Sequence, residues 1–476
     1  MRKSTSMLFS AVGSLCFAST MLSPVVFAQA SDSSGPKVLT LEQVIETADA
    51  NYPAIKEAKA KQKAAQGGIA VARTAYLPRT DVLWQTDRAT ANNILGLLLP
   101  QSTIPSVTGS VIPPNPTRSA WNSAGGALLS WQPFDFGARG AKVEVAKQGS
   151  EAAQQAAALT RLEISTSAGS AFFDLAGSEQ LVVAAQANVQ RYESFDNAVH
   201  VLVDNTLRPG ADASQADAQL ALARNQLIQT QTQVALKRSA LAEYLQFPQA
   251  NTAIDASEIL SALPPSDLQT AVATNHPAIL EECALSKQQE AQKRILDRSY
   301  VPVFSTSGMV FGRGAGTDAS GTFSGGTAGL APNIFNWGAG IQVSFAAFDY
   351  FNIRDQRRVQ EANVLAEHAR YDQSVSDINA ELERAQATLA GARQLAANTP
   401  IELSAARASE QQQQARYRSG LATVVDVATA EALLVQAEGD DVIARLGVWR
   451  AELGVAAAQG DLQPFLKLLQ SQAKGN

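Results

Sequence analysis

The chain has 476 residues, with 38 Lys and Arg against 44 Asp and Glu, and a formal net charge of −6. Because nucleic-acid binding needs a basic face, this acidic balance argues against a nucleic acid as a partner.

The first thirty residues have the pattern of an export signal that is removed from the mature protein. Arg2 and Lys3 form a basic start, residues 7–27 are apolar or small, and residues 28–30 read Ala-Gln-Ala, a typical cleavage site. Cleavage after Ala30 would remove two positive charges and no acidic ones, which leaves 36 Lys and Arg against 44 Asp and Glu, a net charge of −8. The sequence therefore predicts that the chain leaves the cytoplasm.

Two cysteines bear on lipidation and on disulfide formation. Cys16 lies in the signal segment and could mark a lipoprotein, but Leu15 stands where a small residue should precede a modified cysteine. Cys283 is the only cysteine of the mature chain, so it has no internal disulfide, although the predicted compartment would permit one. We expect Cys283 to be a buried, small hydrophobic residue.

Two long uncharged stretches do not have the pattern of a transmembrane helix. Residues 91–117 contain five prolines, which a spanning helix would not tolerate. Residues 319–348 are rich in Gly and alternate as a strand does. An exported chain of this kind is periplasmic, secreted or an outer-membrane barrel, and the strands must decide among the three.

An internal repeat is the most informative feature of the sequence. Four segments of the first half recur in the same order in the second half: 51–53 (Asn-Tyr-Pro) at 275–277 and 76–78 at 300–302, both 224 residues later; 131–136 at 345–350, 214 residues later; and Pro209-Gly210 at Ser419-Gly420, 210 residues later. One short match can arise by chance, but four in order rarely do. The shrinking offset predicts the same units in both halves, with shorter loops in the second.

Each half is predicted to contain the same elements in the same order. A first helix begins at a capping box, residues 40–43 or 266–269, and ends at Pro78 or Pro302. Two strands and a loop follow, then a very long helix, a turn with Gly, and a shorter helix that returns. The predicted division of the chain is a signal peptide (1–30), a first structural repeat (31–246), a linker (247–265), a second repeat (266–460) and a C-terminal tail (461–476).

The long helices, residues 140–205 and 355–418, would each span about 100 Å at 1.5 Å per residue, which no compact globular domain needs. Apolar residues step along them and along the last return helix by three and four, which predicts helix-on-helix packing. These residues are Val189, Tyr192, Phe195, Val199 and Leu202 in the first half and Ile443, Leu446, Trp449 and Leu453 in the second.

The strands alternate in the way that lipid-exposed barrel strands do. Ile341 and Val343 alternate with Gln342 and Ser344, and shorter alternations surround residues 82–84 and 129–131. Aromatic residues at the strand ends are expected to form a girdle at the membrane interface: Trp84, Trp131, Phe134, Phe345, Phe348 and Tyr350. A soluble β-sandwich has the same period and is the alternative.

The number of strands favours a membrane barrel that several chains share. Each half offers two strands, and four strands cannot close a barrel, while open sheet edges are not tolerated in lipid. Two chains would supply eight strands and three chains twelve. Physical reasoning alone does not choose between them.

The sequence resembles the TolC family of outer-membrane efflux factors over nearly all of the mature chain. The resemblance rests on residues 39–45 with 51–53, on the second copy at 275–277, and on residues 417–427, which read Tyr-x-x-Gly, five further residues, then Asp-Val. It implies a mixed α and transmembrane β fold: a homotrimer with one twelve-stranded β-barrel, pooled from four strands per chain, and a long α-helical barrel that reaches across the periplasm.

The resemblance also implies a function without enzymatic chemistry. Such a subunit is a passive conduit in a tripartite export system, which carries small molecules or proteins across the periplasm and outer membrane. Its partners are a periplasmic adaptor protein and, through the adaptor, an inner-membrane pump or exporter. The alternative from another class is a periplasmic coiled-coil adaptor or structural stalk without a pore.

Two groups of site residues follow from the resemblance. The turns at Pro209, Gly210, Gly420 and Leu421 would contact the adaptor, and we expect both glycines to adopt positive φ. Asp426 and Tyr417 would line the inner aperture, where three copies of Asp426 form a ring of carboxylates with raised pKa values. The first repeat departs from the pattern, because Ala216 stands where the aspartate should be. The chain also departs from the family's best-known member, which has a basic residue where this chain has Ala422 and a second aspartate where it has Thr429.

No set of catalytic, cofactor-binding or metal-binding residues is predicted. His200, His276 and His368 lie far apart and are expected to lack metal-ligand partners at the third or fourth residue after each of them. Residues 135–137 read Asp-Phe-Gly without the other motifs of a kinase, and are expected to be the exit from a strand into a helix.

Overall fold

The computed structural model describes residues 37–90, 102–104, 118–248, 252–264, 275–317, 322–345 and 347–473. The predicted export signal with Cys16, the capping box predicted at 266–269 and most of the proline-rich stretch 91–117 lie outside these residues.

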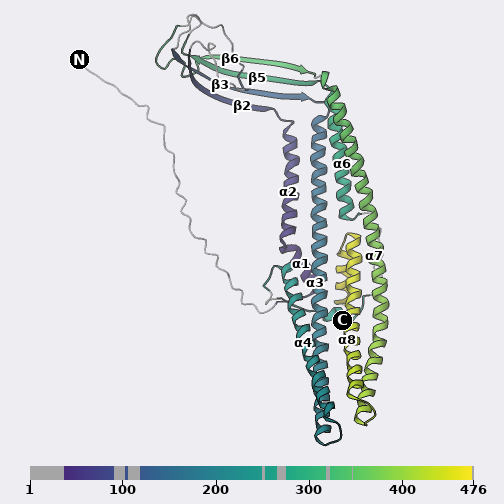
Figure 1. Cartoon of the computed structure of the whole chain (residues 1–476). Helices are drawn as coiled ribbons and strands as arrows, with labels where there is room; N and C mark the ends of the chain where they lie inside the picture. The colour runs from purple at the N-terminus through teal and green to yellow at the C-terminus, as the bar shows by residue number, and fades with distance from the viewer. Residues whose placement is uncertain are drawn as a thin grey trace, which may run out of the picture.

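Two helical hairpins form the long axis of the molecule, with a β-sheet at one end (Figure 1). The first hairpin joins α3 (Ala138–Asp204) to α4 (Gly210–Leu245), and the second joins α7 (Tyr350–Arg418) to α8 (Val424–Gln459). The 67 residues of α3 span about 100 Å at 1.5 Å per residue, as predicted. None of the described helices is both long and apolar enough to cross a membrane.

Shorter helices continue the line of the two return helices toward the sheet. α1 (Leu41–Asn51) and α2 (Pro53–Thr74) lie above α4, and α6 (Pro277–Asp297) lies above α8 (Figure 1). The prediction of one helix from the first capping box to Pro78 was wrong, because the residue before a proline avoids the helical region. Tyr52 has an extended backbone, with φ −65° and ψ 129°, and divides the helix in two.

The junctions between stacked helices explain the repeated Asn-x-Pro motif. Tyr52 stacks on Tyr244 near the end of α4, with ring centroids 5.7 Å apart. In the second half, a Cβ on Gly460 at the end of α8 would lie only 2.8 Å from Cδ of Pro277. The motif therefore marks the place where an upper helix meets the end of a lower one.

Four antiparallel strands form the sheet, in the order β2-β3-β5-β6. They are β2 (Arg79–Thr90), β3 (Ser119–Phe134), β5 (Val303–Ala315) and β6 (Ile334–Ser344). Short 3₁₀ turns, Arg298–Tyr300 and Ala347–Asp349, connect the sheet to α6 and α7. Each repeat thus contributes two strands, as predicted, and β2 and β6 are left as the two edges.

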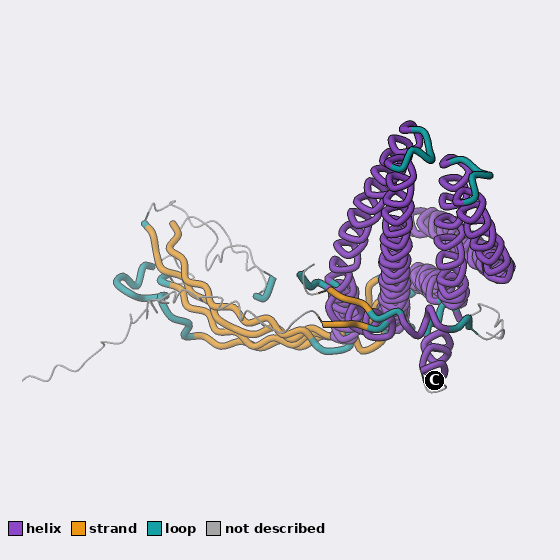
Figure 2. Tube along the Cα trace, turned by 90° about the horizontal axis from the view of Figure 1, so that it is seen from below, coloured by secondary structure: helices purple, strands orange, loops and turns teal. Residues whose placement is uncertain are grey.

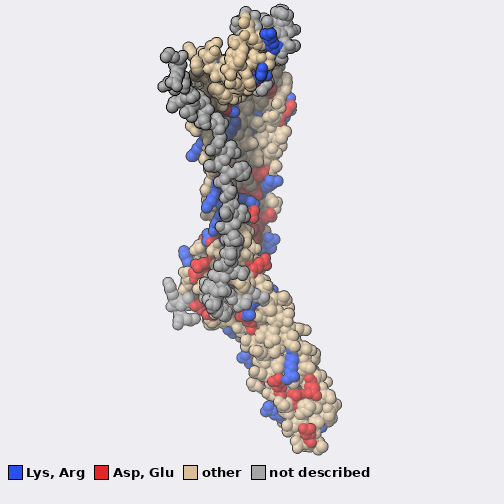
Figure 3. All heavy atoms as spheres, turned by 90° about the vertical axis from the view of Figure 1, so that its left-hand side faces the viewer, with Lys and Arg blue, Asp and Glu red and all other residues tan. Residues whose placement is uncertain are grey.

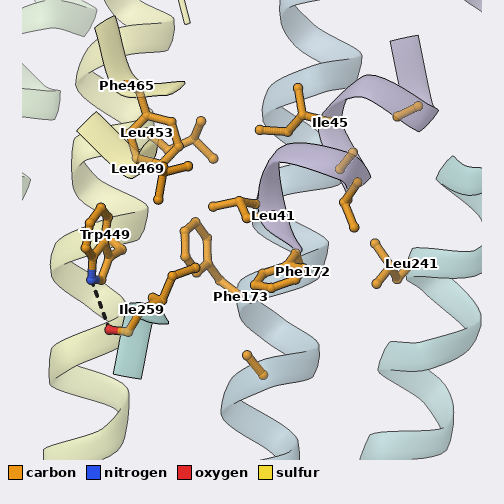
Figure 4. Packing of buried hydrophobic residues seen from close by; sticks show 14 of the residues in the cluster. Leu41, Ile45, Phe172, Phe173, Leu241, Ile259, Trp449, Leu453, Phe465 and Leu469 are labelled. Carbon is orange, nitrogen blue, oxygen red and sulfur yellow. Dashed lines mark hydrogen bonds between the residues drawn. The ribbon is translucent and has the colours of Figure 1, made fainter. Parts of the chain in front are cut away.

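The main hydrophobic core lies midway along the helices, where both repeats meet (Figure 4). Phe172 and Phe173 of α3 contribute to the same cluster as Leu41 of α1 and Trp449 of α8. Most of the predicted packing residues are buried or partly buried, but Ile443 is 52% exposed. Cys283 is partly exposed and not buried as expected.

The predicted linker and C-terminal tail are parts of this core. The linker forms β4 (Thr252–Ile254), which pairs with β1 (Lys37–Leu39), and α5 (Ser257–Ser261). The Trp449 indole donates a hydrogen bond to the carbonyl oxygen of Ile259 at 3.1 Å (Figure 4) and another to that of Ala262 at 3.1 Å. The tail forms α9 (Gln463–Ala473), which buries Phe465 fully. Neither segment is a passive connection.

Candidate functional site

One face of the sheet is an exposed apolar surface. Val82, Ala127, Val310 and Trp337 pair in register across all four strands, and paired residues in an antiparallel sheet point to the same face. Trp337 is 81% exposed, and Ile341, four residues further along the same face of β6, is 82% exposed. Figure 3 shows this end of the molecule largely free of charged side chains, whereas the helices below carry both signs.

The opposite face of the same strands is more polar. Asp81 and Gln85 of β2 and Gln342 and Ser344 of β6 occupy the alternate positions. Seen from below, the strands extend sideways from the helices, so that neither face of the sheet is covered by helices of the same chain (Figure 2). Within the described residues, the two edge strands have no second partner, and much of the sheet is exposed apart from the start of β3, where residues 122–124 are buried.

Five of the six predicted girdle residues gather where the sheet meets the helices, and all five are exposed: Trp131, Phe134, Phe345, Phe348 and Tyr350. The Trp131 indole donates a hydrogen bond to the carbonyl oxygen of Tyr76 at 3.0 Å, which fixes the ring at this level. Trp84 does not belong to this row. It pairs with Gly125 in the interior of β2, because glycine leaves room for its ring.

The Asp-Phe-Gly segment is the corner between β3 and α3, as predicted. Phe136 and Gly137 both have positive φ, 50° and 92°. The Asp135 carboxylate accepts hydrogen bonds from the backbone and the guanidinium of Arg139, and so caps the helix. The role is structural, because the segment reverses the chain at the sheet.

The two tip turns have the same geometry, but the residue of the first turn that corresponds to Gly420 is Thr206 and not the predicted Gly210. In the second turn Gly420 is left-handed, with φ 76°, and the Leu421 amide donates to the carbonyl oxygen of Arg416 at 2.8 Å. In the first turn Thr206 takes the left-handed conformation, with φ 58°, and the Leu207 amide closes the same type of turn. Positive φ at Gly210 was therefore a wrong prediction, because Gly210 is already the first residue of α4.

This correspondence gives Asp426 a counterpart in the first repeat. Thr206 and Gly420 are 214 residues apart, and the same offset relates Asp212 to Asp426. The earlier assignment to Ala216 was wrong, since it matched one glycine with another and not one left-handed residue with another. Both repeats therefore place an aspartate in the first turn of the returning helix.

Asp426 belongs to a capping box at the start of α8. Its carboxylate accepts a hydrogen bond from the Thr423 amide at 2.7 Å, and its own amide donates to the Thr423 hydroxyl at 3.2 Å. The hydrogen bond from the Thr423 amide, followed by a second one from the Thr423 hydroxyl to the same carboxylate at 2.8 Å, lowers the pKa of Asp426 within the single chain. The direction is opposite to the one expected for a ring of carboxylates, which requires neighbouring chains.

Tyr417 is buried at the contact between the two hairpin tips and does not line an open surface of the chain. Its ring packs against Phe195 of α3 with centroids 5.1 Å apart. The Arg208 guanidinium lies over the other side, 4.6 Å from the ring centroid, and donates to the carbonyl oxygens of Tyr417 and Ala422 at 3.0 and 3.4 Å. Burial, together with the charge of Asp212, raises the pKa of Tyr417.

Arg208 was not predicted from the sequence, although a signal existed. It stands two residues after the left-handed Thr206, and Ala422 stands two residues after Gly420. Ala422 stands at the position of the second turn where the resemblance suggested a basic residue. The arginine of the first turn lies at the equivalent position and reaches across to the second turn.

A buried charged cluster lies above the tips between α3, α7 and α8. Glu431 is 1% exposed and accepts hydrogen bonds from Arg191 at 2.9 Å and from Gln414 at 3.1 Å. Arg191 also contacts Glu438 at 3.2 Å. Burial raises the pKa of Glu431 to about 7, in spite of the nearby guanidinium. The helical periodicity gave no sign of this cluster.

His200 has two carboxylate neighbours that the spacing of residues after it did not predict. Its Nε2 lies 3.2 Å from a carboxylate oxygen of Asp217 and 3.7 Å from one of Asp196. The hydrogen bond to Asp217 is the main cause that raises the pKa of this imidazole. His276, in contrast, accepts a hydrogen bond from the Ala278 amide and caps α6, and His368 has a single carboxylate neighbour, Glu290.

An exposed apolar sheet face, open sheet edges and helices of about 100 Å define a class of subunit that assembles in a membrane and projects far from it. The sequence profile described as "outer membrane efflux protein" matches residues 44–245 and 269–461, one segment in each repeat. The chain belongs to this family, which is a family of channels and not of enzymes.

Solved outer-membrane channels share the fold. The outer-membrane channel OprN is 20% identical over 88% of this chain and 89% of its own, with a TM-score of 0.71. VceC from Vibrio cholerae is 19% identical over 88% and 96%, also with a TM-score of 0.71. CusC is 15% identical over 91% and 96%, with a TM-score of 0.73. No sequence among the curated proteins matches the chain.

These comparisons confirm the predicted family, fold class and location. The two matched segments coincide with the internal duplication, and the neighbours combine a helical barrel with a β-barrel. The chain is a channel subunit of the outer membrane whose helices extend into the periplasm. The alternative of an adaptor or stalk without a pore is thereby excluded.

Proposed function

We propose that three copies of this chain assemble into one channel, and that the channel is the passive outer-membrane duct of a tripartite efflux system. The observation that carries the proposal is the four-stranded sheet with two unpaired edges, β2 and β6, and one apolar face. Unpaired backbone groups are costly in lipid, so each edge needs a strand from another copy. Three copies supply twelve strands, the number that the family resemblance implies.

The assembly is tested by the mass of the purified protein in detergent. Each full-length chain contributes 50.2 kDa, so the protein part of the particle should weigh about three times this value before correction for the removed signal. A particle of two chains would contradict the trimer but keep the pooled barrel. A monomer that stays soluble without detergent would overturn the whole proposal.

The inner aperture is proposed to lie at the hairpin tips. Threefold symmetry would arrange the Asp426 side chains in one ring and the Asp212 side chains in a second ring nearby. Rings of carboxylates favour cations in a pore. In planar bilayers, Asp426→Asn and Asp212→Asn should each lower cation selectivity, and unchanged selectivity in both would leave these residues with capping roles alone.

The contact between Arg208 and Tyr417 is proposed to hold the two hairpins of one chain together in the closed aperture. Arg208→Ala removes two hydrogen bonds and a cation–π contact that all join the first hairpin to the second. Channel conductance should therefore rise. Arg224→Ala is the matched control, because Arg224 pairs with Glu193 within the first hairpin. Equal conductance of the two variants would refute the latch.

The tip turns are proposed to receive the periplasmic adaptor, which links the channel to an inner-membrane pump. Leu207 and Leu421 occupy equivalent positions in the two turns and are 68% and 71% exposed, so both tips offer a similar apolar contact beside Pro209 and Gly210. A crosslinker at Leu207 or Leu421 should capture the adaptor in cells. A crosslinker at Leu236, an exposed residue far up α4, should not.

The family description names efflux without a substrate, and we propose small toxic compounds as the exported substrates. Deletion of the gene should increase the susceptibility of the cells to such compounds, and the wild-type gene should restore resistance. If deletion instead blocks the appearance of a secreted protein and leaves susceptibility unchanged, the conduit serves protein secretion.

A further inference from the structure

A series of ion pairs joins α3 to α4 along the first hairpin, and its last member differs from the others. Three pairs contain a Lys or Arg of α4: Asp174–Lys237 at 2.8 Å, Glu179–Arg238 at 2.9 Å and Glu193–Arg224 at 2.8 Å. Asp174 also pairs with Arg450 of α8. Nearest the tip, two carboxylates, Asp196 of α3 and Asp217 of α4, face His200 instead. At this level of the hairpin, the imidazole of His200 stands where the other pairs have a permanently charged Lys or Arg, and two carboxylates are present and not one.

The three side chains have the geometry of a metal site. One oxygen of each carboxylate and the His200 Nε2 lie within 4.8 Å of one another. A tetrahedral Zn²⁺ with bonds of about 2.0–2.1 Å places its ligand atoms about 3.3 Å apart. The observed separations of 3.2 and 3.7 Å to Nε2 are close to this value. Side-chain rotation must also bring the two carboxylate oxygens, which lie within 4.8 Å of each other, to this distance.

The surroundings of the group favour a cation. Within the described residues no Lys or Arg forms an ion pair with Asp196 or Asp217, and Asp204 adds further negative charge near His200. The Asp196 Oδ1 atom is shielded from solvent, and no described residue donates a hydrogen bond to it. The Asp217 side chain is 60% exposed, which leaves the outer side of the group open to a water molecule as a fourth ligand.

We propose that Asp196, His200 and Asp217 bind one divalent transition-metal ion per chain, and that this ion joins α4 to α3 above the first tip. The combination of one imidazole and two carboxylates suits Zn²⁺ better than Mg²⁺, which prefers oxygen ligands in an octahedron. Because the three ligands come from two antiparallel helices, the bound ion restrains the hairpin near the first tip turn. This site is independent of the export function proposed above.

The test is calorimetric titration of the full-length protein, purified in detergent and freed of metal with a chelator, with ZnCl₂. The wild type should bind one ion per chain with micromolar affinity, and MgCl₂ should give no such binding. His200→Gln and Asp217→Asn should each weaken Zn²⁺ binding by more than about 100-fold, since each removes a direct ligand. His368→Gln is the matched control, because within the described residues His368 contacts one carboxylate, that of Glu290. The Zn²⁺ affinity of this variant should equal that of the wild type.

A second measurement addresses the restraint. Zn²⁺ should slow amide hydrogen exchange in residues 196–217 of the wild type and of His368→Gln, but not of His200→Gln. Absence of saturable Zn²⁺ binding to the wild type would overturn the proposal. Unchanged Zn²⁺ binding by His200→Gln would also overturn it, because the ion would then bind elsewhere on the surface. Binding without slower exchange would overturn the restraint between the two helices.

Discussion

Gly420→Val tests whether the second tip turn depends on a left-handed backbone. Gly420 has φ 76°, and no atom lies within 4 Å of the position that a Cβ would take. A side chain therefore meets no steric obstacle, and the cost is backbone strain alone. For an L-residue this strain is about 1–2 kcal/mol, and a β-branched residue lies at the upper end. The population of the opened turn should rise about 5- to 30-fold.

Hydrogen exchange of the Leu421 amide reports this population, because that amide donates to the carbonyl oxygen of Arg416 at 2.8 Å in the closed turn. Its exchange rate should rise by the same factor in Gly420→Val. Gly210→Val is the matched control: Gly210 is the first residue of α4, does not have positive φ and also has open space around it. Equal exchange in the two variants would refute the assignment of the left-handed position.

Three further predictions concern pH dependence, the core and the sheet. Because the folded-state pKa of Glu431 is raised from 4.5 to about 7, the stability that the protonated form provides is present below pH 4.5 and is lost as the pH rises to about 7. The loss is at most about 3 kcal/mol, and Glu431→Gln should remove this slope in denaturant titrations between pH 5 and 8. Trp449→Phe should lower the unfolding free energy by about 1–3 kcal/mol, because the carbonyl oxygens of Ile259 and Ala262 lose a buried donor; an unchanged melting temperature would show that these bonds contribute nothing. Ile341→Lys should disfavour membrane insertion by about 2–4 kcal/mol, whereas Gln342→Lys on the other face should not, and similar yields of both variants in the outer-membrane fraction would contradict the assignment of the lipid face.

Local patterns predicted much of the fold. The period of two along β6 and the steps of three and four along α3 are properties of neighbouring residues, so the strands and long helices could be located before their packing was known. The duplication added the order of the elements, because the motifs at 51–53 and 275–277 mark equivalent helix junctions. The linker at 247–265 was predicted only to separate the repeats, and its pairing with β1 and its contact with Trp449 could not be predicted from a local period.

The candidate site contains features that local sequence patterns could not predict. Gly210 and Gly420 were matched because both are glycines, but a left-handed turn is set by the hydrogen bonds that close it, and Thr206 also accepts that conformation. Arg208 and Tyr417 are 209 residues apart in the chain, and no local period connects them. Asp426 was found by its motif, but its capping bonds appeared only with the geometry of α8.

The sequence by itself determined the class of this protein: an exported, duplicated chain with two long helices and strands of alternating polarity in each half. These features follow from composition, local periodicity and the recurrence of motifs. Only the tertiary structure decided which turn residues correspond, that Arg208 spans the two tips, and that Asp196, His200 and Asp217 converge. The physical reason is that each of these depends on side chains from different helices, whose distances are set by the packing of the whole hairpin and not by spacing along the chain.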